Sequence, residues 1–206
     1  MPSITRVMFR LAVAAPVIVV GTAGAQEPVG DALTNDGVLR ASAKVDSVFV
    51  DRHVQEAVVA PGDFASYLMA RLGVIPIPED LRFRVLVDSQ RIRLNGRIQD
   101  LPREARVELG PLLAVFPPET MVNAFVLLTS AGPRAIRFRL HSVTVNGFPV
   151  PEIALQTVLY DVGKRYPELT KTGRDLYVEI PSTAQVILSN GSVRLVGPLP
   201  ADAGSP

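Results

Sequence analysis

Histidine and cysteine, the side chains that carry much of enzyme chemistry, are scarce in this chain. There is no cysteine, which excludes a thiol nucleophile, a cysteine-ligated metal and a disulfide framework. The two histidines, His53 and His141, are too few for a three-histidine metal centre. No serine stands in the Gly-x-Ser-x-Gly pattern of a hydrolase elbow, and the glycines form no phosphate-binding loop. The sequence therefore predicts a protein that is not an enzyme, with no catalytic residues, no metal and no cofactor.

His141 and Ser142 keep one catalytic hypothesis open. In the strand pattern around them, apolar residues occupy the even-numbered positions from Ile136 to Leu140 and the odd-numbered positions Val143 and Val145. This change of phase predicts a β-bulge or bend near His141, and bulges are over-represented beside active sites. A hydrolase that uses His141 is thus the least favoured of three hypotheses.

The first 25 residues have the pattern of a secretory signal peptide. Arg6 and Arg10 give a positive start, Leu11 to Val20 is apolar, and Ala23-Gly24-Ala25 matches a small-residue cleavage site. The apolar stretch has about ten residues, where a membrane-spanning helix needs about 20. We expect cleavage after Ala25 and a periplasmic or secreted protein of the cell envelope. An uncleaved membrane anchor is the alternative.

The charge balance gives no sign of nucleic acid binding. The chain carries 21 Lys+Arg and 20 Asp+Glu, and loss of the signal peptide changes its formal net charge from +1 to about −1. There is no basic run, so the electrostatic footprint of a nucleic-acid-binding protein is missing. The 206 residues are enough for one sizeable core.

One folded domain is predicted over residues 44–197. Residues 26–43 lack a sustained hydrophobic period and are expected to form a flexible lead-in, and residues 198–206 a flexible tail. At the start of the domain, Lys44–Val50 and His53–Val59 are rich in valine. They predict a first pair of strands.

Two amphipathic helices are predicted within this domain. Asp63 is a suitable N-cap for a helix that ends at Leu72, before Gly73. A second helix opens after Pro151 and ends near Tyr166. Their apolar stripes are formed by Phe64, Tyr67, Leu68 and Leu72 and by Leu155, Val158, Leu159, Val162 and Tyr166.

Strand patterns dominate the remaining residues. Over residues 81–98, apolar residues alternate with arginines around Asp88-Ser89-Gln90, which predicts a hairpin with one buried face and one face of arginines. Residues 122–128 are apolar on both faces, as in a strand covered on both sides. Residues 176–196 end in a hairpin with an Asn190-Gly191 turn. This order predicts an α+β fold, in which a long curved antiparallel sheet wraps over two amphipathic helices.

The apolar surfaces of helix and sheet are the most informative feature for function. The plain interpretation is an ordinary core, and the sharper one is an incompletely closed apolar groove that holds a lipid or another apolar small molecule. The residues expected to line such a groove are Phe64, Leu68, Leu72, Phe83, Val85, Phe138, Leu155, Val158, Leu159 and Val162.

An envelope interaction or scaffold protein with a filled core is the alternative to lipid binding. Its binding surface for a membrane or an envelope protein would be the arginine face of the sheet. That face is predicted to carry Arg82, Arg84, Arg91, Arg93, Arg137 and Arg139.

Several short motifs resemble bacterial exported proteins of the tubular lipid-binding (TULIP, SMP-like) type. They are Asp63-Phe64-x-x-Tyr67-Leu68, Leu109-Gly110-Pro111-Leu112-Leu113, Val143-x-Val145-Asn146-Gly147-Phe148-Pro149-Val150-Pro151 and the hairpin from Ile180-Pro181 to Leu195. The resemblance covers about 45–197 and implies a sheet rolled around a long helix, with lipid in an apolar groove and no catalytic residues. The helix at 151–166 is shorter than that family expects.

Overall fold

The computed structural model describes residues 28–101, 106, 116–165 and 173–198. The predicted signal peptide, the Leu109–Leu113 motif and the tail after residue 198 lie outside these residues. The side chains of Val158 and Val162 are also outside the described set.

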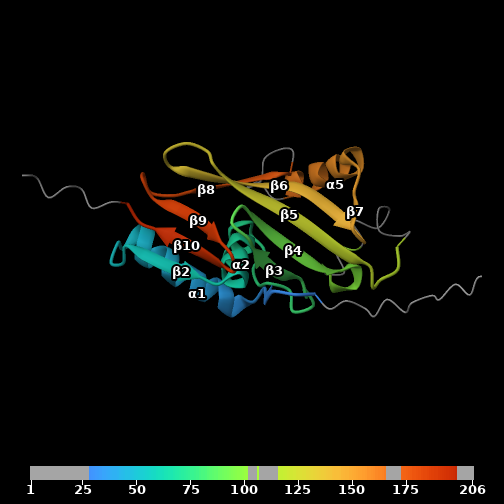
Figure 1. Cartoon of the computed structure of the whole chain (residues 1–206), viewed down its shortest axis with the longest axis horizontal. Coiled ribbons are helices and arrows are strands. Elements are labelled where there is room, and N and C mark those ends of the chain that lie inside the picture. Colours follow the sequence, from blue (N-terminus) through green and yellow to red (C-terminus); the bar gives the residue numbers. More distant parts are fainter. Residues whose placement is uncertain (1–27, 102–105, 107–115, 166–172, 199–206) are drawn as a thin grey trace, which may run out of the picture.

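Two antiparallel sheets and three α-helices build the described part of the chain, so the predicted α+β class is confirmed (Figure 1). The larger sheet has the order β1-β3-β4-β5-β6-β7, and β8 pairs with β6 beside β7. Its strands are β1 (Asp31–Ala32), β3 (Arg84–Val87), β4 (Arg91–Arg97), β5 (Met121–Ser130), β6 (Ala135–Val145), β7 (Phe148–Pro149) and β8 (Asp175–Glu179). The smaller sheet has the order β2-β10-β9, with β2 (Glu56–Val59), β9 (Gln185–Ser189) and β10 (Ser192–Val196). The helices are α1 (Asn35–Val45), α2 (Pro61–Arg71) and α5 (Glu152–Arg165), with a π-helix at Asp46–Val50 and a 3-10 turn at Ile98–Asp100.

The main core lies between the larger sheet, helices α1 and α2, and the smaller sheet. Phe64 of α2 packs on Phe138 of β6, with their ring centroids 5.9 Å apart. Val193 and Leu195 of β10 contribute fully buried side chains to the same cluster. The core is thus shared by both sheets.

The region predicted to be a flexible lead-in is structured, and this prediction was wrong for residues 31–43. Strand β1 pairs with β3, and α1 starts at a Thr34 cap whose side chain accepts a hydrogen bond from the Gly37 amide at 2.9 Å. Gly37 and Ala41 are buried on the helix face that contains Val45. A Cβ on Gly37 would lie 2.9 Å from Asp63 and 3.1 Å from Ser66, so this small residue lets α1 approach α2 closely.

The predicted strand over Lys44–Val50 is helical. Val48 and Phe49 are buried in the core as part of the π-helix, because tertiary packing overrides the strand preference of valine and phenylalanine. Of the second predicted strand, only Glu56–Val59 is extended. It pairs with β10 and not with residues 44–50.

Helix α2 starts three residues earlier than predicted, with Pro61 in its first turn and Ala60 as N-cap. Asp63 is therefore not the cap. Its carboxylate instead accepts two hydrogen bonds from Arg40 of α1, at 2.9 and 2.7 Å. Gly73 follows the helix with a φ of 82°, as its predicted role as a stop requires.

The predicted hairpin and bulge are both confirmed. Strands β3 and β4 pair in register around a turn in which Asp88 accepts the amides of Gln90 and Arg91 at 3.0 and 2.9 Å. The register between β5 and β6 shifts at Phe125/Val126, opposite Ser142 and Leu140, so His141 is the extra residue of a bulge. The inner face of the larger sheet carries the buried Val85, Val87 and Ile92, and the outer face carries the arginines.

Helix α5 does not join α1 and α2 in one layer. In Figure 1 it lies beside β7, separated from both of them along the long axis of the molecule. Leu155 and Leu159 are buried. The larger sheet was expected to wrap over two helices, one ending at Leu72 and one over 151–166. The first of these, α2, does pack beneath the sheet. The helix packed beside it is α1, and not the helix predicted over 151–166.

Candidate ligand-binding groove

The predicted lining residues of α2 and the sheet meet in a closed interior. Phe64, Leu68 and Phe138 line one small cavity together with Val45, Phe49 and Ile136. Its volume is about 20 Å³, enough for roughly one water molecule. An acyl chain has no room at this place, so these side chains are core.

The remaining predicted lining residues are distributed over the molecule. Phe83 and Val85 are buried in the main core, where a Cβ on Gly96 would lie 2.7 Å from the Phe83 ring. Leu72 is half-buried against the same core. Leu155 and Leu159 are buried on α5, and the side chains of Val158 and Val162 are not described. The eight predicted residues whose side chains are described do not surround one groove.

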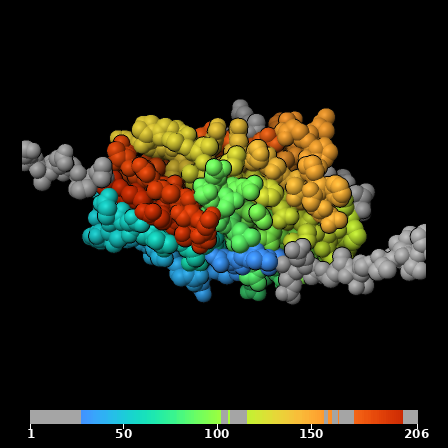
Figure 2. All heavy atoms as spheres, in the orientation of Figure 1, coloured from blue at the N-terminus to red at the C-terminus, as the bar shows by residue number. Residues whose placement is uncertain are grey.

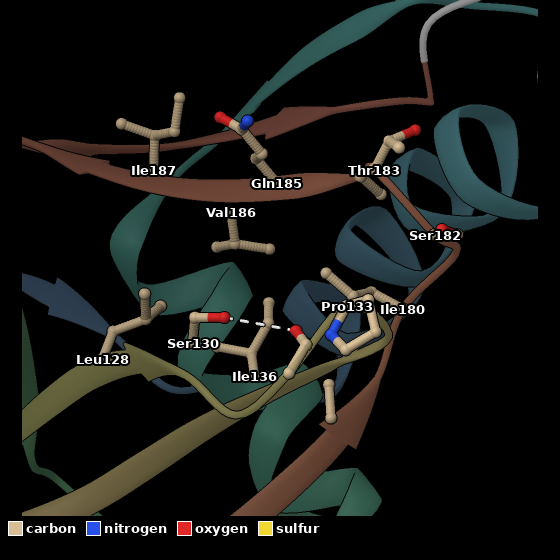
Figure 3. A pocket seen from close by; sticks show the side chains of 13 residues that line it. Leu128, Ser130, Pro133, Ile136, Ile180, Ser182, Thr183, Gln185, Val186 and Ile187 are labelled. Atoms are coloured by element: carbon tan, nitrogen blue, oxygen red, sulfur yellow. Dashed lines mark hydrogen bonds between the residues drawn. The ribbon is translucent and has the colours of Figure 1, made fainter.

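An open groove lies instead at the junction of the two sheets, between β9 and the β5–β6 hairpin (Figure 3). Its volume is about 470 Å³, within the range of ligand pockets. Val186 points from β9 into the groove toward Ser130 and Ile136. The full lining is Leu128, Ser130, Gly132, Pro133, Ala135, Ile136, Ile180, Ser182, Thr183, Ala184, Gln185, Val186 and Ile187.

The groove is open because strand pairing stops on both of its sides. The pairing of β4 with β5 ends at Arg91 and Leu127, so residues 128–130 of β5 extend past β4. Strand β9 is the terminal strand of its sheet and pairs with β10 alone among the described strands. Two strand edges thus border the groove. In Figure 2 the red atoms of the smaller sheet and the yellow atoms of the hairpin adjoin at this junction.

The groove continues at both ends. Toward the β3–β4 turn it meets a hollow of about 440 Å³, with which it shares Leu128, Val186 and Ile187. Toward the π-helix it meets a wider hollow of about 1100 Å³, with which it shares Pro133 and Ile180 among others. The three hollows share lining residues and so adjoin one another along the junction of the two sheets, and we call this row of hollows the depression. Its middle part has an apolar floor.

Two residues with unusual backbone geometry line this depression. Thr183 in the β8–β9 loop has a φ of 68°, and Arg52 after the π-helix has a φ of 57°. A left-handed conformation is uncommon for residues other than glycine, and a β-branched residue is an outlier there. Strain of this kind concentrates at ligand clamps and active sites.

Tyr67 lies between the closed interior and the wider hollow, and its side chain lines both. Burial raises the pKa of its hydroxyl, and the charge of Arg71 partly opposes that rise. The phenol therefore stays protonated at neutral pH and presents an O–H donor at the wide end of the depression.

The sequence pattern did not indicate the groove residues of the β8–β9 loop, of β9 and of the turn before β6. The signal available was the run Val186-Ile187-Leu188, which is apolar at three consecutive positions and so does not alternate. Residues 122–128 have the same property and lead into the other border. Apolar side chains on both faces of two strands are compatible with a second apolar surface, but the place where pairing stops is not encoded in either strand alone.

The outer face of the larger sheet carries the predicted arginines. On this face, strand β4 carries Arg91, Arg93 and Arg97, which lie beside residues of β5. Strand β6 carries Arg137 and Arg139, which lie opposite Tyr177 and Asp175 of β8. The guanidinium groups of Arg91 and Arg93 lie 5.2 and 5.4 Å from the centroid of the Phe125 ring. Arg84, Arg91, Arg93, Arg137 and Arg139 thus lie in the strands of this sheet as predicted, whereas Arg82 lies before β3 and outside a strand.

The bulge residue His141 is exposed, and no acidic partner for it is found among the described residues. The described residues also contain no group of three or more His, Asp or Glu side chains that could hold a metal ion. Within the same part of the chain, no helix is long and apolar enough to cross a membrane.

Comparison with known proteins returned no match from family models, curated proteins or solved structures.

Proposed function

We propose that this protein binds an elongated apolar ligand, such as the acyl chain of a lipid, in the groove between β9 and the β5–β6 hairpin, without catalysing a reaction. The observation that carries this proposal is the depression of three adjoining hollows at the sheet junction, whose 470 Å³ middle part is lined by Leu128, Ile136 and Val186 among others. As an exported protein, it would hold lipid in the cell envelope. Its membership of the tubular lipid-binding type is part of the same proposal.

The physical basis is the burial of methylene groups. Each methylene removed from water contributes about 0.8 kcal/mol, so a chain of eight to ten carbons in the groove offsets the cost of association. The polar residues Ser182, Thr183 and Gln185 lie along the β9 side. Ser130 donates a hydrogen bond to the Gly132 carbonyl at 3.2 Å, so its hydroxyl does not require a ligand as partner.

Two valine variants test the proposal. Val186→Asp places a charge where the side chain points into the groove, whereas Val58→Asp places it on β2 at a position that is 52% exposed. With the mature chain and a fluorescent fatty acid as probe, we expect Val186→Asp to weaken binding at least about tenfold and Val58→Asp to leave it unchanged. Equal binding by both variants, or no binding by the native chain, would contradict the proposal.

A second variant, which fills the groove, keeps the test valid if Val186→Asp fails to fold. The chain contains no tryptophan, so Ser130→Trp both occupies the groove and gives a single fluorescence reporter. Ser130 is exposed, and the substitution should leave the melting temperature nearly unchanged while it blocks the probe. A Ser130→Trp protein that is folded and binds the probe normally would exclude this groove.

The arginine face supports a second candidate function, the binding of an acidic envelope partner. Its specific support is that Arg84, Arg93 and Arg97 form no salt bridge with a carboxylate within the described part of the chain, unlike Arg91 and Arg139. Guanidinium groups without a neutralising carboxylate favour an anionic surface above them. If Arg84→Glu and Arg93→Glu leave association with membranes and envelope proteins unchanged, this function is excluded.

A further inference from the structure

Three arginines from separate segments surround the wide end of the depression. Arg52 follows the π-helix, Arg71 is the last residue of α2, and Arg134 lies in the turn between β5 and β6. All three are exposed. They lie apart in the sequence, and the fold brings them to one hollow of about 1100 Å³.

These three arginines differ in their ion pairing from other arginines of the chain. Arg40, Arg139 and Arg194 each hold a carboxylate with two hydrogen bonds. No salt bridge joins Arg52, Arg71 or Arg134 to a carboxylate within the described part of the chain. Their donors are therefore available to a ligand.

The balance of charge in the hollow is positive. Asp46 and Glu179 also line it, so the three guanidinium groups exceed the carboxylates by one. The Tyr67 hydroxyl adds a neutral donor. Arginine is the side chain best suited to bind phosphate and carboxylate groups, since its planar donors match their oxygens.

The position of this charged hollow relative to the groove indicates the kind of ligand. The two share Pro133, Ala135, Ile180 and Ser182, so a single molecule can occupy both. We propose that the ligand is a lipid with an anionic head group, held with the head among Arg52, Arg71 and Arg134 and with one chain along β9. This inference rests on the proposed function and adds the class of ligand to it.

Lipids that differ only in their head group test the inference. Vesicles of dioleoylphosphatidylcholine that contain a minor fraction of either dioleoylphosphatidylglycerol or a labelled dioleoylphosphatidylcholine are incubated with the mature chain, and bound lipid is measured by native mass spectrometry. We expect the anionic lipid to bind at least about tenfold more tightly, with a preference that falls as salt rises. Equal binding of the two lipids would overturn the inference and leave the proposed function intact. Absence of both lipids would count against the groove itself.

A matched pair of triple variants locates the preference. Arg52→Gln, Arg71→Gln and Arg134→Gln together should abolish the preference while phosphatidylcholine still binds. The control carries Lys44→Gln, Lys164→Gln and Arg194→Gln, which change the net charge equally, line none of the three hollows and lie outside the arginine face. The control should keep the preference. If both triple variants lose it to the same extent, general electrostatic attraction explains it and the assigned site is wrong.

Discussion

The closed interior beneath the larger sheet and the open junction along β9 are lined by similar apolar residues, yet they differ more than twentyfold in volume. Ile136, Ile180 and Val186 line both. Side-chain type therefore does not decide which of the two is open. The interior is closed because α2 presses Phe64 onto Phe138, and the junction is open because β4 ends before β5 does.

This comparison assigns different roles to the two regions. The densely packed side chains of the interior stabilise the fold, and truncating one of them leaves a cavity. Residues at the junction have room, so changes there should affect ligand binding more than stability. The following variants test this separation in order of expected effect.

Phe138→Ala is expected to have the largest effect on stability. The side chain is 4% exposed and packs on Phe64, so its loss should lower the free energy of unfolding by about 3–5 kcal/mol. Urea denaturation monitored by circular dichroism measures the change. Phe148→Ala, at a position 74% exposed, is the matched control and should be close to neutral. Similar losses in both variants would contradict the description of the interior as filled.

Gly96→Ala tests the same interior from the side of the sheet. A Cβ at this position would lie 2.7–2.9 Å from the Phe83 ring, and overpacking of this kind costs about 2 kcal/mol. The smaller side chain in a Gly96→Ala/Phe83→Leu double variant should recover part of that loss. Strictly additive losses in urea denaturation would show that the two positions do not compete for space.

Asp175→Asn should have a smaller effect, and one that depends on pH. Hydrogen bonds from Arg139 at 2.8 and 3.1 Å lower the pKa of the buried Asp175 carboxyl, partly opposed by burial. The carboxylate then stabilises the fold at pH values above the ordinary aspartate pKa near 4, and this contribution is lost as the pH falls through its lowered value. Since Arg139 is 44% exposed, we expect a loss of about 1–2 kcal/mol at pH 7.

The matched control for Asp175 is Glu56, which Arg194 holds with the same two-bond geometry on the smaller sheet. The Arg194 and Glu56 side chains are both more than 40% exposed, so Glu56→Gln should change the melting temperature less than Asp175→Asn does. The difference between native and Asp175→Asn proteins should disappear near pH 2. A constant difference from pH 7 to pH 2 would exclude the titration of Asp175 as its source.

The sequence predicted the elements whose pattern is local. Alternation fixed the faces of β3 and β4, the change of phase after Leu140 located the bulge, and Asn190-Gly191 located the last turn. Helix α1 was missed because Gly37 and Ala41 are too small to register as an apolar stripe, although their small size is what allows contact with α2. The groove was missed because it depends on where two strands stop pairing, a property of the assembled sheets. Arg52, Arg71 and Arg134 were missed for the same reason, because only the assembled fold brings them to one hollow.

Thr183→Gly is expected to have the smallest effect, and one of opposite sign. A left-handed conformation costs a residue with a side chain about 1–2 kcal/mol, and glycine removes this cost while it loses about 0.5–1 kcal/mol through its freer unfolded chain. With a φ of 68° at Thr183, the net result should be a stabilisation of about 0.5 kcal/mol, or a rise of about 1–2 °C in melting temperature. The control is Thr144→Gly within β6, where the backbone is extended and paired, so glycine should destabilise. A lower melting temperature for Thr183→Gly would mean that the Thr183 side chain stabilises the β8–β9 loop by more than its backbone costs, and the junction would then resemble the interior in depending on packing.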